Sequence, residues 1–370
     1  MGQAGKPTDW ITMKIDPEIF EELGVRDPEE TKREMAISKK TRQINKELKA
    51  DPDNLELQLE FATLLIDGAN YEDAIKQLKL IRNKDSKNPR VYKLLGTAYV
   101  LFNHEDEAIL ELNRAAELDR NDAEIYFNLG GVYLLRDMYQ NAAESFEKAI
   151  AIDPTDTTSY ANLAAAYDML KLYDKEVVAL KKVLMFNPED KELRAALSNA
   201  YFNCDQFEEA IDAALVVVEI DEKDPQAHCN LGNCYAAQSM VDDAIKAFNK
   251  ASELAPDYSL PHTNLGILYA SLGRIEAGIK ELKVAVTLNA QDAGAWITLY
   301  SCYKEVGLME ESQNAYRKYE AILEGPELQQ SHGGENPSNI PGGVSQTSKL
   351  AGGGKLQDNA AGLETLADGE

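Results

Sequence analysis

Residues 123–156 read AEIYFNLGGVYLLRDMYQNAAESFEKAIAIDPTD, and their apolar side chains follow a helical period in two separate runs. Tyr126 and Tyr133 lie two helical turns apart, which predicts a first amphipathic helix. After a short polar stretch, Phe146 stands among alanines at helical spacing and marks a second helix. Pro154 ends that second helix. We therefore expect this stretch to fold as two antiparallel helices joined by a tight turn.

The same frame recurs every 34 residues along most of the chain. Seven tyrosines keep this interval, and a leucine precedes each of them by four residues. A fixed period near 34 indicates an array of one repeated supersecondary unit. The tyrosines are Tyr99, Tyr133, Tyr167, Tyr201, Tyr235, Tyr269 and Tyr303, and the leucines are Leu95, Leu129, Leu163, Leu197, Leu231, Leu265 and Leu299. The predicted units are 55–88, 89–122, 123–156, 157–190, 191–224, 225–258, 259–292 and 293–326.

Small residues alternate with large ones within each unit. Gly130 and Ala142 allow the two helices to approach closely, and Phe146 fills the space between them, as a close-packed core requires. This pattern resembles the tetratricopeptide repeat family over residues 55–326. The resemblance implies an all-α fold of about eight antiparallel helix pairs, stacked in a right-handed superhelix. It also implies that the first helix of each pair lines a concave inner groove.

The two ends of the chain depart from the repeat. Residues 1–54 are expected to hold capping helices that cover the first full unit. Residues 327–370 are rich in glycine and polar residues, and we expect a disordered tail there. Leu356, Leu363 and Leu366 leave open a second interpretation, in which this tail forms a weak helix when it docks.

Composition narrows the class of partner. The chain has a net charge of −25, and residues 55–326 carry 26 basic and 45 acidic residues. Such a body repels nucleic-acid phosphates and favours basic protein partners. Solubility alone is an alternative reason for the charge. No apolar run has the length of a membrane span, and the N-terminus has no apolar signal region. We therefore expect a cytoplasmic protein that binds neither membranes nor nucleic acid.

Catalytic and metal-binding patterns are missing from the sequence. The four cysteines have no zinc-site or CxxC spacing and read as reduced thiols. The glycines before Lys355 lack the following Ser or Thr of a phosphate loop. His228 and His262 take a large packing position of the repeat. The sequence therefore predicts a protein that is not an enzyme and has no cofactor and no metal.

One pattern suggests recognition of a polypeptide. The residue before the repeated leucine is asparagine in four units, and a further asparagine follows three residues later in two units. An amide side chain offers a donor and an acceptor, which complement a peptide backbone. We expect these amides to face the inner groove and to hold an extended chain. The candidate residues are Asn128, Asn162, Asn230 and Asn264, with Asn199 and Asn233 as additional contacts.

This pattern resembles the asparagine ladder in the repeat superhelix of the O-linked N-acetylglucosamine transferase, whose catalytic domain is absent here. Ala196, Leu94 and Thr298 interrupt the ladder. A clamp for the C-terminal carboxylate of chaperones fits less well, since only Lys93 and Asn128 match it.

The sequence thus predicts a scaffold or adaptor that binds a protein segment in its groove. A self-associating structural component and a non-catalytic regulatory subunit of an enzyme complex remain alternatives. Glu176 breaks the repeat, because alanine opens the second helix at this place in most units. Its carboxylate is expected either to strain the junction or to tilt into solvent.

Overall fold

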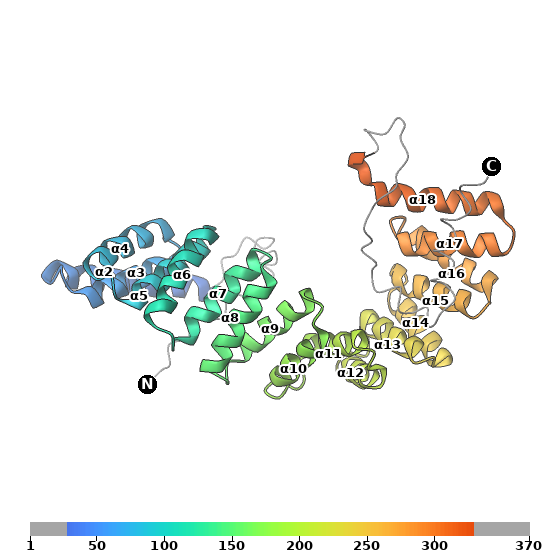
Figure 1. The fold of residues 1–370 in the computed structure, drawn as a ribbon, viewed down its shortest axis with the longest axis horizontal. Coiled ribbons are helices and arrows are strands. Elements are labelled where there is room, and N and C mark those ends of the chain that lie inside the picture. Colours follow the sequence, from blue (N-terminus) through green and yellow to red (C-terminus); the bar gives the residue numbers. More distant parts are fainter. Residues whose placement is uncertain (1–27, 329–370) are drawn as a thin grey trace. The chain divides into compact units, whose positions relative to one another are not determined.

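The computed structural model describes residues 28–328, so residues 1–27 and the expected tail from 329 onward lie outside the described part (Figure 1). The described residues form seventeen α-helices and no strand. The predicted all-α repeat fold is confirmed. The first described helix, α2 (Pro28–Ala50), is one continuous helix of 23 residues.

Sixteen helices follow α2 as eight successive pairs. Each pair has a first and a second helix of 12 to 14 residues, except that α18 is longer. The pairs are α3 (Leu55–Asp67) with α4 (Tyr71–Lys84), α5 (Pro89–Leu101) with α6 (Glu105–Leu118), α7 (Ala123–Leu135) with α8 (Tyr139–Ile152), α9 (Thr157–Met169) with α10 (Tyr173–Leu184), α11 (Lys191–Asn203) with α12 (Phe207–Ile220), α13 (Pro225–Ala237) with α14 (Val241–Leu254), α15 (Ser259–Ser271) with α16 (Ile275–Leu288), and α17 (Ala293–Glu305) with α18 (Met309–Leu328).

Polar caps and tight turns set the helix ends at the repeat interval. Asn54 and Asp122 each precede a first helix, and their side chains accept a hydrogen bond from a backbone N–H of its first turn. The turn into the second helix contains one residue with positive φ, such as Asp137 at 54° or Gly273 at 71°. These local signals explain why each pair is antiparallel and compact.

Close packing of the two helices depends on the small residues. A Cβ atom added to Gly130 would lie 2.6 Å from Cε1 of Phe146, and one added to Gly96 would lie 2.4 Å from Cγ of Leu112. No real Cβ atom tolerates such distances. The predicted role of Gly130 in helix approach is therefore confirmed.

The chain divides into two compact units, Met1–Ala166 and Tyr167–Glu370. In the first unit, one apolar cluster runs from Leu59 to Val132 through consecutive pairs. In the second unit, separate clusters surround Phe248 and Leu299. The repeated tyrosines pack within these units; Tyr99 and Tyr303, for example, are buried. Each unit is thus a stack of helix pairs, with one apolar cluster through consecutive pairs in the first unit and separate clusters in the second.

Glu176 on α10 is buried with only 5 % of its surface exposed. Its Oε2 atom makes no hydrogen bond among the described residues. Burial, reinforced by the negative charge of Asp168, raises the pKa of this carboxyl to about 8. Of the two alternatives for Glu176, the one in which its carboxylate tilts into solvent was wrong, because the side chain is buried.

Candidate peptide-binding groove

The six candidate asparagines all lie on first helices, and they fall in both units. Asn128 on α7 and Asn162 on α9 belong to the first unit. The second unit holds Asn199 on α11, Asn230 and Asn233 on α13, and Asn264 on α15. The structure therefore defines two separate groups, and each group is described by itself.

In the second unit, one pair of asparagines is joined across neighbouring first helices. Nδ2 of Asn264 donates to Oδ1 of Asn233 at 2.8 Å and also lies 3.6 Å from the Cys229 sulfur. Asn264 is only 3 % exposed. Its amide donor is thus used inside the protein, so Asn264 holds the repeats together rather than offering a free donor. A structural asparagine and a ligand-binding asparagine have the same residue type and the same repeat position, so the sequence alone does not distinguish these two roles.

The equivalent pair one repeat earlier behaves differently. Asn199 and Asn230 are also 31 residues apart and lie on α11 and α13. Asn199 is exposed and Asn230 is half-buried. Among the described residues, neither side chain makes a hydrogen bond, in contrast to the Asn233–Asn264 pair. These two amides therefore keep their donors and acceptors available for a ligand.

In the first unit, each asparagine also lies 31 residues after a position on the preceding first helix, but the residue at that position is not an asparagine. Nδ2 of Asn128 donates to Oγ1 of Thr97 at 3.3 Å. The residue 31 positions before Asn162 is Gly131, which has no side-chain acceptor. Asn162 is 9 % exposed, and its Nδ2 atom is covered and unpaired in the part of the chain that the structure describes. An unpaired buried donor costs about 1–3 kcal/mol, which an accepting ligand group would recover after rotation of the amide.

The one matching cation of the chaperone clamp is already neutralised. The Lys93 ammonium lies 2.7 Å from Oδ2 of Asp122 and 2.7 Å from Oε2 of Glu124. Partial burial is the largest single influence on Lys93 and lowers its pKa. The two carboxylates together outweigh it, so the pKa of Lys93 is raised above its ordinary value. Lys93 therefore anchors two repeats and is not free to bind a carboxylate ligand.

A polar hollow of about 710 Å³ lies beside the loops that enter α7 and α9 in the first unit. Its acidic lining includes Asp122, Glu124 and Asp153. Asp122 accepts from the backbone N–H of Glu124 and pairs with Lys93. These carboxylates already serve as helix caps and in ion pairs. We therefore assign no ligand to this hollow.

The described residues lack two further kinds of feature, a metal-binding cluster and a membrane-spanning helix. No group of three His, Cys, Asp or Glu side chains between residues 28 and 328 is placed to hold a metal ion. Within the same range, every helix is too short or too polar to cross a membrane. Both histidines of the large packing position have partners: Nε2 of His228 lies 2.9 Å from the Glu222 carbonyl oxygen, and Nδ1 of His262 lies 2.8 Å from Oε2 of Glu281.

Family models match several parts of the chain. Models described as tetratricopeptide repeat match residues 123–156 and 225–258, residues 44–98, and residues 145–177. A further model, described as TPR repeat, matches residues 106–137. No curated protein sequence matches the chain significantly.

Among solved structures, the chain is similar to YrrB, described as "a TPR protein with an unusual peptide-binding site", at 23 % identity and a TM-score of 0.46. That match covers 50 % of this chain and 95 % of YrrB. MamA from Desulfovibrio magneticus RS-1 matches at 23 % identity and a TM-score of 0.41, covering 45 % of this chain and 94 % of MamA. A chain of the APC/C heterotetramer Cut9–Hcn1 matches at 17 % identity and a TM-score of 0.41, covering 72 % of this chain and 52 % of that chain. The family matches and the stacked helix pairs together support the tetratricopeptide repeat family, and the described fold is a tetratricopeptide-repeat fold.

Proposed function

We propose that the chain is a non-catalytic protein-interaction scaffold that holds an extended segment of a partner protein along its first helices. Tetratricopeptide-repeat proteins are in general protein-interaction scaffolds. The observation that carries the finer proposal is the unbonded pair Asn199 and Asn230 in the second unit. Two amides on neighbouring helices, each with a free donor and acceptor, complement the alternating N–H and C=O groups of an extended backbone.

The bonded pair refines which asparagines contribute. Asn264 already donates to Asn233, so it positions the Asn233 amide instead of binding the partner directly. Asn128 and Asn162 provide a second, smaller set in the first unit. The partner segment is therefore expected to gain about 1 kcal/mol from each amide that it contacts. The acidic repeats favour a segment with basic residues.

The test has two steps. Crosslinking of the full chain in lysate, read by mass spectrometry, identifies partner segments that attach near α11 and α13. The affinity of such a segment is then measured for the wild type and for Asn199→Ala/Asn230→Ala, which should bind about 30-fold more weakly if both amides contribute. The helicity and melting temperature should stay unchanged, since neither side chain has a structural partner.

Asn264→Ala is the matched control, because it removes a structural hydrogen bond and leaves the free pair intact. It should lower stability while changing affinity less than the double variant. Equal affinity of the wild type and Asn199→Ala/Asn230→Ala would refute the groove proposal. Light scattering that rises with concentration in the absence of a partner would favour the self-assembling alternative, and an enzyme activity that co-purifies would favour the regulatory subunit.

A further inference from the structure

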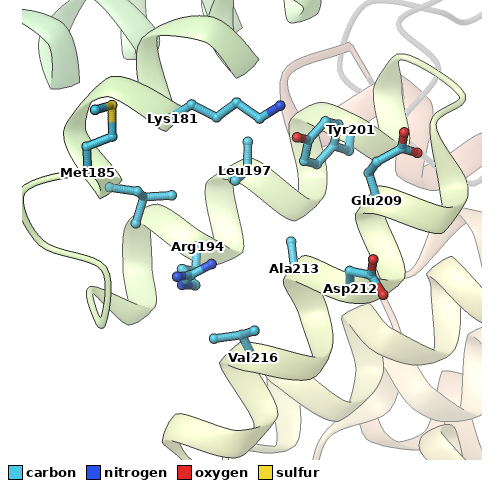
Figure 2. A pocket seen from close by; sticks show the side chains of 10 residues that line it. Lys181, Met185, Arg194, Leu197, Tyr201, Glu209, Asp212, Ala213 and Val216 are labelled. Carbon is cyan, nitrogen blue, oxygen red and sulfur yellow. The ribbon is translucent and has the colours of Figure 1, made fainter.

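A second surface of the second unit is a groove of about 410 Å³ between α10, α11 and α12 (Figure 2). Its lining residues come from all three helices and from the residue after α10. Leu184, Leu197, Ala213 and Val216 provide apolar lining, and Met185 stands beside them with 72 % of its surface exposed. We call these five residues and their charged neighbours the fifth-pair groove.

Charged residues of opposite sign flank this apolar lining. Lys181 on α10 and Arg194 on α11 are basic, Glu209 and Asp212 on α12 are acidic, and the Lys181 side chain extends toward Tyr201 (Figure 2). The Lys181 ammonium lies 5.2 Å from the centre of the Tyr201 ring, and Nε of Arg194 donates to the Pro188 carbonyl oxygen at 2.7 Å. Among the described residues, neither Lys181 nor Arg194 forms an ion pair with Glu209 or Asp212, so all four charges can still attract a charged ligand.

The same place in another repeat is polar. A groove in the third pair is lined by residues that lie 68 positions, or two repeats, before those of the fifth-pair groove. Glu117 stands there in place of Met185, Ser145 in place of Ala213 and Lys148 in place of Val216. The groove itself thus comes from the repeat geometry, but its lining is apolar in the fifth pair and polar in the third.

In the second pair this place is closed by an ion pair. Nη1 of Arg82 lies 2.6 Å from Oε1 of Glu111, and these residues lie three repeats before Leu184 and Ala213. The seventh pair uses His262 and Glu281, at 2.8 Å, in positions equivalent to Arg194 and Ala213. The second, third and seventh pairs therefore place polar side chains in this space, whereas the fifth pair has Leu184 and Ala213 there. Leu184, Leu197 and Ala213 form the floor of the groove, and Met185 stands exposed at its edge.

We propose that residues 355–368 of this chain, KLQDNAAGLETLAD, dock in the fifth-pair groove as an amphipathic helix. In a helix, Leu356, Leu363 and Leu366 fall on one face, seven and three residues apart. Glu364 and Asp368 fall on one flank of that face, and Lys355 falls on the other. The acidic flank complements Lys181 and Arg194, and Lys355 complements Glu209 and Asp212. A helix laid in an apolar groove is a recurring mode of peptide recognition.

The connecting length permits this contact. Residues 329–354 separate the docking segment from the end of α18, and 26 residues span at most about 90 Å. Neighbouring helices pack 8–10 Å apart, so the six steps from α12 to α18 place the helix axes at most about 60 Å apart. Tethering also raises the effective concentration of the segment to the millimolar range, which compensates for a small interface.

A disulfide trap in the full chain tests the proposal. Met185→Cys/Leu363→Cys, in a Cys204→Ser background, should form an intramolecular disulfide about tenfold faster than Glu219→Cys/Leu363→Cys. Glu219 is the equivalent position one repeat nearer to α18 in the same unit, so a shorter tether cannot explain faster trapping at Met185. Met185 and Glu219 are both exposed, so these substitutions leave the core unchanged.

A second measurement needs no new cysteine. Amide hydrogen exchange of residues 355–368 should be slower in the wild type than in Met185→Glu, which copies the third-pair residue into the fifth-pair groove. Leu363→Glu should give the same loss of protection. Equal trapping rates for the two cysteine pairs, or no protection of residues 355–368 in the wild type, would overturn the proposal. Disulfide-linked dimers that vanish on dilution would assign the groove to a second copy and would also overturn it.

Discussion

Glu176→Gln should stabilise the second unit above neutral pH and have little effect in acid. The carboxyl is buried, its Oε2 atom has no partner among the described residues, and its pKa in the folded protein is about 8. Its ordinary pKa is 4.5. The folded state therefore keeps a proton between about pH 4.5 and pH 8 that the unfolded state has lost, so this group makes stability fall as pH rises through that window.

The magnitude follows from the size of the pKa difference. At 1.36 kcal/mol per pKa unit, a rise from 4.5 to about 8 corresponds to an upper bound of about 5 kcal/mol at pH 9. Local rearrangement that lets water reach the carboxylate reduces this bound, and we expect about 1–3 kcal/mol. Glu176→Ala should gain at least as much, because alanine occupies the equivalent buried place at Ala142 and Ala210.

Urea unfolding followed by circular dichroism measures the difference between variant and wild type from pH 5 to pH 9. Comparing differences at each pH cancels the titration of the many other carboxylates. Asp174→Asn is the control, because it makes the same change from carboxyl to amide at an exposed position in the first turn of the same helix. A difference for Glu176→Gln that is constant from pH 5 to pH 9 would refute the assignment of a raised pKa.

Three further predictions concern the repeat itself. Gly273→Ala should lower the free energy of unfolding by about 1 kcal/mol, since its φ is 71°, whereas Asp137→Gly should raise it slightly; urea unfolding of both checks the sign. Gly130→Ala should cost about 1–3 kcal/mol, because the new Cβ would lie 2.6 Å from the Phe146 ring, and a loss below 0.5 kcal/mol would contradict the close approach. Cys229 should resist alkylation in the native protein, since burial raises its pKa to about 12, and rapid labelling that a peptide map assigns to Cys229 would show that the core opens.

Much of the fold was predictable because its signals are local. The 34-residue period, the Asn and Asp caps and the small residue at Gly130 each act within one helix pair. Helix periodicity and capping depend on residues a few positions apart, so the sequence shows them directly. The sequence predicted capping helices within residues 1–54 but not their bounds, because α2 (Pro28–Ala50) lies outside the 34-residue frame that fixes the other helices.

The candidate site was predictable only in part. The repeat frame places six asparagines on first helices, and the structure describes all of them there. It also shows that Asn264 is bonded to Asn233, that Asn128 is bonded to Thr97, and that Asn162 is covered. These differences depend on which residue stands 31 positions earlier and on whether the two side chains meet in space.

Sequence alone therefore determined that this chain folds as paired helices at a constant interval, because local spacing decides which face of each helix is apolar. Only the tertiary structure decided which polar side chains remain available and where an apolar groove stays open. Lys181, Arg194 and Val216 line one groove from three helices. The burial of Glu176 and the ion pair of Arg82 with Glu111 likewise depend on the tertiary structure. Availability of a side chain is a property of its neighbours in space, which a single repeat does not specify.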